Sequence, residues 1–190
     1  MFLNIIFSIF VFYVLIQAIY EKRPVYRQMN RVIGFKRAKL LYIDKQEEVK
    51  RRNVIYGKLL KSEKYGISGK PDYIYELGNE LIPLELKSTK VDDNSPLFKD
   101  VMQLAAYFLI IEEVFGKKVI RGRIIYQNTM FEVYNRKKVR KDLMEIIKNM
   151  RLMENGKYDP EERGSFIKCR FCPCRGTVCK IYEEDGKVDD

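Results

Sequence analysis

The chain of 190 residues contains no histidine. This absence excludes Ser-His triads, histidine general bases and zinc sites with histidine ligands. Carboxylates, lysine and tyrosine remain as the groups for acid–base or electrostatic catalysis. The chain also shows no internal repeat and no low-complexity linker, and its length suits one domain with a substantial core.

Charged side chains are missing from residues 1–20, MFLNIIFSIFVFYVLIQAIY. A helix of about twenty residues spans about 30 Å, the thickness of a bilayer's hydrocarbon core. A cleaved signal peptide fits poorly, because no basic region precedes the run and no A-x-A site follows it. The basic flank that follows predicts a single-pass anchor of the cell membrane with the remaining chain in the cytoplasm. A buried N-terminal helix is the alternative.

Basic residues are in excess over acidic ones. Lys and Arg number 36 against 26 Asp and Glu, which gives a net charge of +10. Such a balance suggests a polyanionic partner, either nucleic acid or an anionic membrane surface. A proteome that is basic throughout would produce the same excess.

Two β-favouring runs, Asp72–Leu77 and Leu81–Lys87, flank the pair Gly78-Asn79. A Gly-Asn pair in this setting predicts a β-hairpin with a two-residue loop. The neighbouring residues in these runs are mostly apolar, so the hairpin borders a core; they are Tyr73, Ile74, Tyr75, Leu84 and Leu86.

A two-residue loop places Leu77 opposite Glu80 and, counting outwards, Asp72 opposite Glu85. Lys87 points to the same face as Glu85. Two carboxylates this close repel each other, and a magnesium or manganese ion relieves the repulsion. A lysine beside such an ion can position or deprotonate a water, or stabilise charge on a phosphate. The alternative is a surface hairpin with a cross-strand ion pair.

Four cysteines lie close together in the C-terminal segment KCRFCPCRGTVCK, with the spacing C-x2-C-x-C-x4-C. They are Cys169, Cys172, Cys174 and Cys179. Four neighbouring thiolates suit an iron–sulfur cluster or a zinc ion. Unmetallated cysteines on a C-terminal tail are the alternative.

Periodicity predicts the remaining elements. We expect helices over residues 23–42, 97–115 and 137–153, with Ser95 as N-cap of the second, and strands at Val54–Leu60, Val119–Gln127 and Met130–Tyr134. Together with the hairpin they predict a single α/β unit, in which a mixed central sheet is flanked by helices.

Three motifs occur in an order that resembles a known nuclease family. Pro71-Asp72 followed by Glu85-Leu86-Lys87 resembles the PD-(D/E)XK signature, and the run from Gln103 to Tyr107, QLAAY, resembles the Q-x-x-x-Y motif of its RecB-like branch. With the GKPD run and the cysteine cluster, residues 40–182 resemble the CRISPR-associated RecB-like exonucleases, the fourth Cas protein, and their stand-alone relatives.

This resemblance implies a restriction-endonuclease-like core and metal-dependent hydrolysis of DNA ends with single-stranded character. It assigns Mn²⁺ or Mg²⁺ binding to Asp72, Glu85 and the Leu86 carbonyl, and catalytic roles to Lys87, Gln103 and Tyr107. It also implies a 4Fe-4S cluster, for which zinc is the alternative, and other CRISPR adaptation proteins as partners. The predicted organisation is an anchor (1–20), a basic helix and connector (21–50), a nuclease core (51–163) and a cysteine segment (164–190).

The chain departs from this family at two places. It lacks the cysteine that the family usually has near its N-terminus, and Cys174 is the candidate replacement. It also lacks the histidine upstream of the hairpin, for which Glu47 and Glu48 are candidate substitutes. Two further readings therefore stay open: a DNA-binding module without catalysis, and a membrane-tethered iron–sulfur protein.

Overall fold

The computed structural model describes residues 6–7, 9–14, 24–29, 35–44, 51–92 and 94–155. The chain divides into two compact units, residues 1–144 and 145–190. The strands are β1 (Tyr26–Met29), β2 (Lys39–Ile43), β3 (Ile55–Tyr56), β4 (Leu60–Ser62), β5 (Ile67–Gly69), β6 (Tyr73–Leu77), β7 (Glu80–Leu86), β8 (Arg121–Ile125) and β9 (Met130–Tyr134). The long helices are α2 (Phe98–Phe115) and α3 (Lys137–Glu154).

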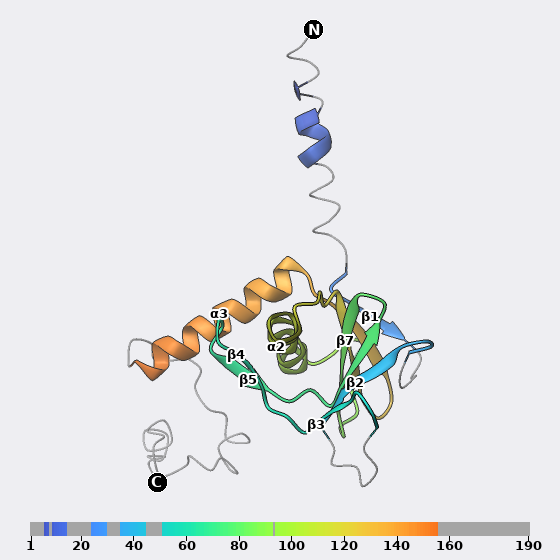
Figure 1. Ribbon diagram of the computed structural model, residues 1–190. Helices are drawn as coiled ribbons and strands as arrows, with labels where there is room; N and C mark the ends of the chain where they lie inside the picture. Colours follow the sequence, from blue (N-terminus) through green and yellow to red (C-terminus); the bar gives the residue numbers. More distant parts are fainter. Residues whose placement is uncertain are drawn as a thin grey trace, which may run out of the picture. The chain divides into compact units, whose positions relative to one another are not determined.

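Within the described part of the chain, seven strands form one mixed sheet in the order β1-β9-β8-β7-β6-β2-β3. β7 and β8 are parallel, as are β2 and β3, and the other neighbours are antiparallel. β4 and β5 form a separate antiparallel pair. α2 packs against β7 and β8 on one side and against β4 and β5 on the other (Figure 1). The prediction of an α/β fold with a mixed central sheet and flanking helices is confirmed.

The centre of the sheet is apolar because it is covered on both faces. Leu81, Ile82 and Leu84 of β7 and Ile124 of β8 are fully buried. A parallel pair of strands needs such cover, since its connection crosses one face. α2 lies in the connection between β7 and β8, and it is also the helix that packs against these two strands.

Gly122 sets the distance between α2 and the sheet. A Cβ atom at this position would lie 2.8 Å from the Phe108 ring and 3.0 Å from both Leu104 and the Pro83 carbonyl oxygen. Only glycine therefore allows the helix to lie this close to β8.

The helix predicted over residues 23–42 is wrong where the structure describes it, because Tyr26–Met29 and Lys39–Ile43 are strands. β1 pairs with β9, and β2 lies between β6 and β3. Backbone hydrogen bonds to strands distant in sequence outweigh the local helical spacing, which carried the prediction.

Two smaller predictions also need correction. The strand expected at Val54–Leu60 is split between β3 and β4, with Gly57 at φ +54° between them. α2 begins after Leu97, which has no side-chain capping bond, and not after Ser95. The other helices and strands lie within a few residues of their predicted bounds.

The predicted membrane anchor is contradicted. Of residues 1–20, positions 6–7 and 9–14 are described as helical, and the others lie outside the described residues. No helix within the described ranges combines the length and the apolar character needed to cross a membrane. A span requires about 20 consecutive apolar helical residues, so the described residues contradict the prediction of a single-pass membrane protein.

We predict that Gly122→Ala lowers the free energy of unfolding by about 1–3 kcal/mol, because the added methyl group overpacks the contact with α2. Urea unfolding measures this change. Ser68→Ala, at an exposed position of β5, is the control and should change stability by less than about 0.5 kcal/mol. A Gly122→Ala protein as stable as the parent would show that α2 tolerates a greater separation from the sheet.

Candidate active site

The hairpin brings Asp72 and Glu85 together as its register predicts. Leu77 pairs with Glu80 and Tyr73 with Leu84, so the next pair outwards is Asp72 and Glu85. The backbone N–H of Leu86 donates a hydrogen bond to Asp72 Oδ2 at 2.6 Å, which fixes this carboxylate against the end of β7. The predicted register is confirmed.

Glu85 is a buried carboxylate whose two oxygens differ in their hydrogen bonding. Its side chain accepts hydrogen bonds at Oε1 from Lys87 Nζ at 3.2 Å and Gln103 Nε2 at 2.7 Å. Oε2 is buried and has no hydrogen-bond partner among the residues that the structure describes. Burial raises the pKa of Glu85, the charge of Asp72 raises it further, and Lys87 only partly offsets the two.

Helix α2 supplies the predicted partners of Lys87. Lys87 Nζ donates to Gln103 Oε1 at 2.6 Å, and Gln103 Nε2 donates to the Tyr107 hydroxyl at 2.9 Å. Tyr107 in turn donates to the Lys70 carbonyl oxygen at 3.1 Å. Gln103 and Tyr107 therefore share one helix face, and Gln103 is a half-buried member of the network instead of a solvated position.

Burial raises the pKa of Tyr107 to about 12, and the neighbouring charges of Glu85, Asp72 and Asp44 contribute to the rise. The hydroxyl group is therefore protonated at neutral pH and acts as a donor. The ring is close to Gly69, where a Cβ atom would lie 2.7 Å from Tyr107 Cε1.

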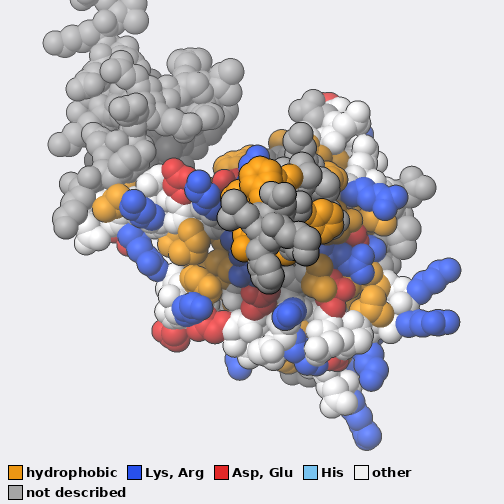
Figure 2. Space-filling view, turned by 90° about the horizontal axis from the view of Figure 1, so that it is seen from above, with side chains coloured by type: hydrophobic (Ala, Val, Ile, Leu, Met, Phe, Trp, Pro, Cys, Tyr) orange, Lys and Arg blue, Asp and Glu red, His pale blue; other side chains and the backbone are white. Residues whose placement is uncertain are grey.

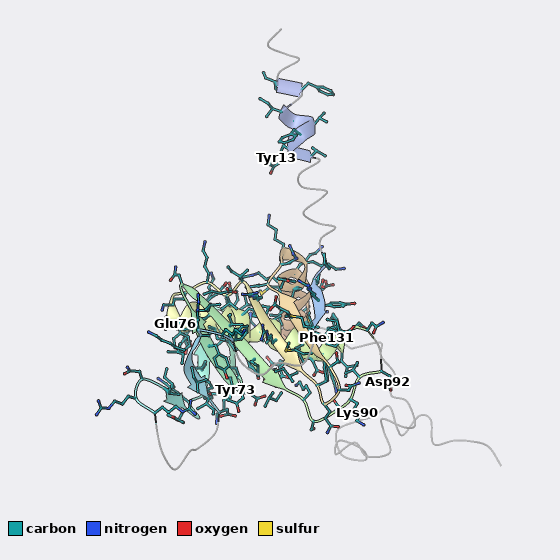
Figure 3. All side chains as sticks on the ribbon, turned by 90° about the vertical axis from the view of Figure 1, so that its right-hand side faces the viewer. Tyr13, Tyr73, Glu76, Lys90, Asp92 and Phe131 are labelled. Carbon is teal, nitrogen blue, oxygen red and sulfur yellow. The ribbon has the colours of Figure 1, made fainter. Side chains whose placement is uncertain are left out.

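The loop between β7 and α2 is tied to the neighbouring strands. Val91 donates its backbone N–H to Asn128 Oδ1 at 3.1 Å and accepts from Asn128 Nδ2 at 2.7 Å. Lys90 and Asp92 on either side are exposed, and Figure 3 shows them at the margin of the structure. These bonds attach the loop to the turn between β8 and β9.

Sequence reasoning missed two acidic residues of this region. Asp100, on the first turn of α2, is 4% exposed and forms an ion pair with Lys87 at 3.3 Å. Its spacing of three residues before Gln103 on a helix is the signal that could have identified it. Asp44 follows β2 and donates its backbone N–H to the Asp72 carbonyl oxygen at 3.0 Å. It lies three residues before Glu47, the first of the two glutamates that the sequence suggested.

Several predicted site residues are not located by these contacts. Glu47, Glu48 and the cysteines Cys169, Cys172, Cys174 and Cys179 lie outside the described residues. The role of the Leu86 carbonyl stays a prediction, because the contact of Leu86 with the site is the hydrogen bond from its backbone N–H to Asp72.

The donor set fits a magnesium or manganese ion. Within the described ranges, no group of three or more His, Cys, Asp or Glu side chains is gathered for a metal. Two carboxylates are enough for Mg²⁺, which keeps several waters and is completed by substrate phosphates. The buried Oε2 of Glu85, next to the charge of Asp72, is the atom that most requires a cation.

The chain matches a known family and a solved structure. The family model of the PD-(D/E)XK nuclease superfamily matches residues 16–180. The crystal structure of SSO0001 matches with a TM-score of 0.41 and 21% identity over 60% of this chain and 51% of that chain. The chain thus spans about half the length of that protein. No curated protein matches the chain.

The raised pKa of Glu85 predicts how the metal-free protein responds to pH. A folded-state pKa above the ordinary 4.5 means that the folded protein binds this proton more readily than the unfolded chain. The contribution of Glu85 to stability is therefore greatest at acid pH and is lost as the pH rises through the raised pKa.

We predict that Glu85→Gln raises the melting temperature of the metal-free protein at neutral pH, because removing an incompletely paired buried charge is worth about 1–3 kcal/mol. The difference from the parent should vanish near pH 4. Mg²⁺ should stabilise the parent but not Glu85→Gln. Asp92→Asn, which removes an exposed charge from the adjoining loop, is the control. Equal melting curves for Glu85→Gln and the parent at neutral pH would contradict the prediction.

Proposed function

The chain belongs to the PD-(D/E)XK nuclease superfamily, and from this we propose that it is a metal-dependent nuclease that hydrolyses phosphodiester bonds at DNA ends. The observation that supports the proposal most directly is the buried, unpartnered Oε2 of Glu85 beside Asp72. Glu132 also has a buried Oε2 without a hydrogen bond, but that oxygen lies 3.5 Å from Arg123 Nε, whereas Glu85 lies beside the negative charge of Asp72.

In this proposal Asp72, Glu85 and the Leu86 carbonyl hold Mg²⁺ or Mn²⁺. When bound, the ion supplies positive charge that polarises a phosphate and lowers the pKa of a water molecule. Lys87 places an ammonium group beside the same carboxylates, where it orients the attacking water and offsets the negative charge of the transition state.

Gln103 holds Lys87 and Glu85 together through its amide oxygen and amide nitrogen, at 2.6 and 2.7 Å respectively. Tyr107 supports Gln103 from the next turn of α2. We assign positioning roles to both residues, because no contact of either group requires it to transfer a proton.

We propose DNA with single-stranded ends as the substrate, in line with the sequence resemblance to CRISPR-associated RecB-like exonucleases. The net charge of +10 favours a polyanion. Figure 2 shows Lys and Arg side chains at several places around the face in view, mixed with acidic ones. Association with other CRISPR adaptation proteins belongs to the same proposal, and the genes next to this one would test it.

We predict that Mn²⁺ or Mg²⁺ supports cleavage of end-labelled single-stranded DNA and that chelation abolishes it. Glu85→Ala and Lys87→Ala should each lose about a hundred- to a thousand-fold in rate, because each change removes an interaction that stabilises transition-state charge. Both variants should still bind DNA, since many other basic residues contribute to binding. Gel assays of cleavage and fluorescence anisotropy of binding measure the two effects.

Lys90→Ala is the matched control, because Lys90 is an exposed lysine three residues after Lys87. It should cleave DNA at the parent rate. Full activity in Lys87→Ala would remove Lys87 from the mechanism. Salt-sensitive DNA binding without cleavage in any divalent metal would instead favour the non-catalytic binding module.

We further propose that Cys169, Cys172, Cys174 and Cys179 bind a 4Fe-4S cluster, on the strength of their spacing in the sequence. Protein purified without oxygen should then be brown and absorb broadly in the visible range. Cys174→Ser should bleach this absorbance if Cys174 replaces the missing N-terminal cysteine. A cluster retained in full by Cys174→Ser would exclude Cys174 as a ligand, and colourless protein with stoichiometric zinc would favour the zinc site.

A further inference from the structure

Asp100 is a buried carboxylate that has no role in the mechanism proposed above. It lies on the first turn of α2 and is 4% exposed. Its Oδ1 is 3.3 Å from Lys87 Nζ, and its Oδ2 accepts a hydrogen bond from the Tyr126 hydroxyl at 2.7 Å. The two oxygens therefore connect the ammonium group of Lys87 with a tyrosine of the adjoining strand segment.

Tyr126 is itself fixed. It is fully buried directly after β8, and its hydroxyl oxygen accepts the backbone N–H of Leu97 at 3.1 Å. The preceding residue, Ile125, accepts the backbone N–H of Lys87 at 2.8 Å. Burial and the bond to Asp100 raise the pKa of Tyr126, so its hydroxyl remains a donor. Tyr126 thus links Asp100 to the end of β8 and to the start of α2.

Three oxygens surround the ammonium group of Lys87, one for each of its N–H bonds. They are Gln103 Oε1 at 2.6 Å, Glu85 Oε1 at 3.2 Å and Asp100 Oδ1 at 3.3 Å. Glu85 is shared with the proposed metal, and Gln103 carries no charge. Asp100 is the one charged member of the three that does not also belong to the proposed metal-binding pair.

We propose that Asp100 and Tyr126 are a positioning pair that holds the Lys87 ammonium group in place independently of Glu85. The inference rests on the proposed function only where it concerns the reaction rate. Asp100 fixes the ammonium group by charge and distance, and Tyr126 fixes the carboxylate of Asp100. Neither residue touches the phosphate in this arrangement.

A merely structural role for Asp100 is the competing explanation, because an acid in the first turn of a helix is stabilising there. A structural role predicts lower stability without any particular effect on Lys87. The two explanations are separated by measurements on Lys87 itself and by comparison with a second buried carboxylate.

The kinetic arm uses Asp100→Asn and Tyr126→Phe in the full chain with Mn²⁺ and single-stranded DNA. Asp100→Asn should lower kcat about 10- to 100-fold with KM unchanged, the usual effect of losing a residue that orients a reactive group. Tyr126→Phe should lower kcat less. The double variant should resemble Asp100→Asn, because Tyr126 acts through Asp100.

The second arm needs neither metal nor DNA. The protein is prepared with lysines that carry ¹³C and ¹⁵N. In the parent, the Lys87 ammonium group should give an NMR signal, because its hydrogens exchange slowly with water. Asp100→Asn should broaden or abolish this signal, and Tyr126→Phe should weaken it. Glu132→Gln is the matched control, because Glu132 is also 4% exposed and pairs with Arg121 and Arg123. It should lower stability but leave kcat and the Lys87 signal unchanged.

An unchanged Lys87 signal in folded Asp100→Asn would overturn the inference, whatever the activity. So would equal losses of signal in Asp100→Asn and Glu132→Gln. If Asp100→Asn does not fold, Tyr126→Phe decides by the same signal. A parent protein that cleaves no DNA would refute the proposed function, and the NMR arm would still decide whether Asp100 positions Lys87.

Discussion

The burial of the Glu85 carboxylate beside Asp72 is the constraint on which the candidate site depends. A carboxylate that is 6% exposed must be compensated, and Lys87 and Gln103 compensate only one of its oxygens. The other oxygen and the nearby charge of Asp72 leave negative charge that a divalent cation relieves. The feature that destabilises the metal-free fold is therefore the one that the proposed metal ion would relieve.

Helix α2 contributes one face to the core and a neighbouring face to the site, because residues three and four apart share a face of a helix. Leu104 and Phe108 pack on the sheet at Gly122, while Asp100, Gln103 and Tyr107 follow the spacing i, i+3, i+7 on a neighbouring face. Close packing at one face therefore sets the distance from the other face to Lys87. The site is as well defined as the contact between α2 and β8, which explains why a glycine lies at that contact.

The hairpin and its three charged residues could be predicted from the sequence because they depend on local rules. The Gly78-Asn79 turn fixes the register, and the register brings Asp72 and Glu85 together. The spacing of Asp100 before Gln103 places both on one helix face, but the contact of Asp100 with Lys87 could not be found in this way, because it depends on how α2 crosses the sheet. The strand β1 was missed for a similar reason, since its partner β9 lies about a hundred residues further along the chain. Both features depend on contacts between residues far apart in the sequence, and the periodicity of apolar residues does not predict such contacts.

Two ionic clusters on neighbouring strands of the sheet show why burial alone does not identify a catalytic site. Arg123 pairs with Leu84 and Ile124 with Glu85, so Arg123 and Glu85 point to opposite faces of the sheet. Glu132 lies opposite Arg123, and Arg121 and Arg123 approach its two oxygens to 3.2 and 3.5 Å. Because Glu80 lies 3.3 Å from Arg121, that cluster has two arginines for two carboxylates, and the Phe35 ring covers Arg123, so the charges need no added cation. The single ammonium group of Lys87 forms ion pairs with two buried carboxylates, Glu85 and Asp100, and the charge of Asp72 also acts on Glu85. The excess of negative charge, not the depth of burial, distinguishes the face with the proposed metal site from the opposite face of the sheet.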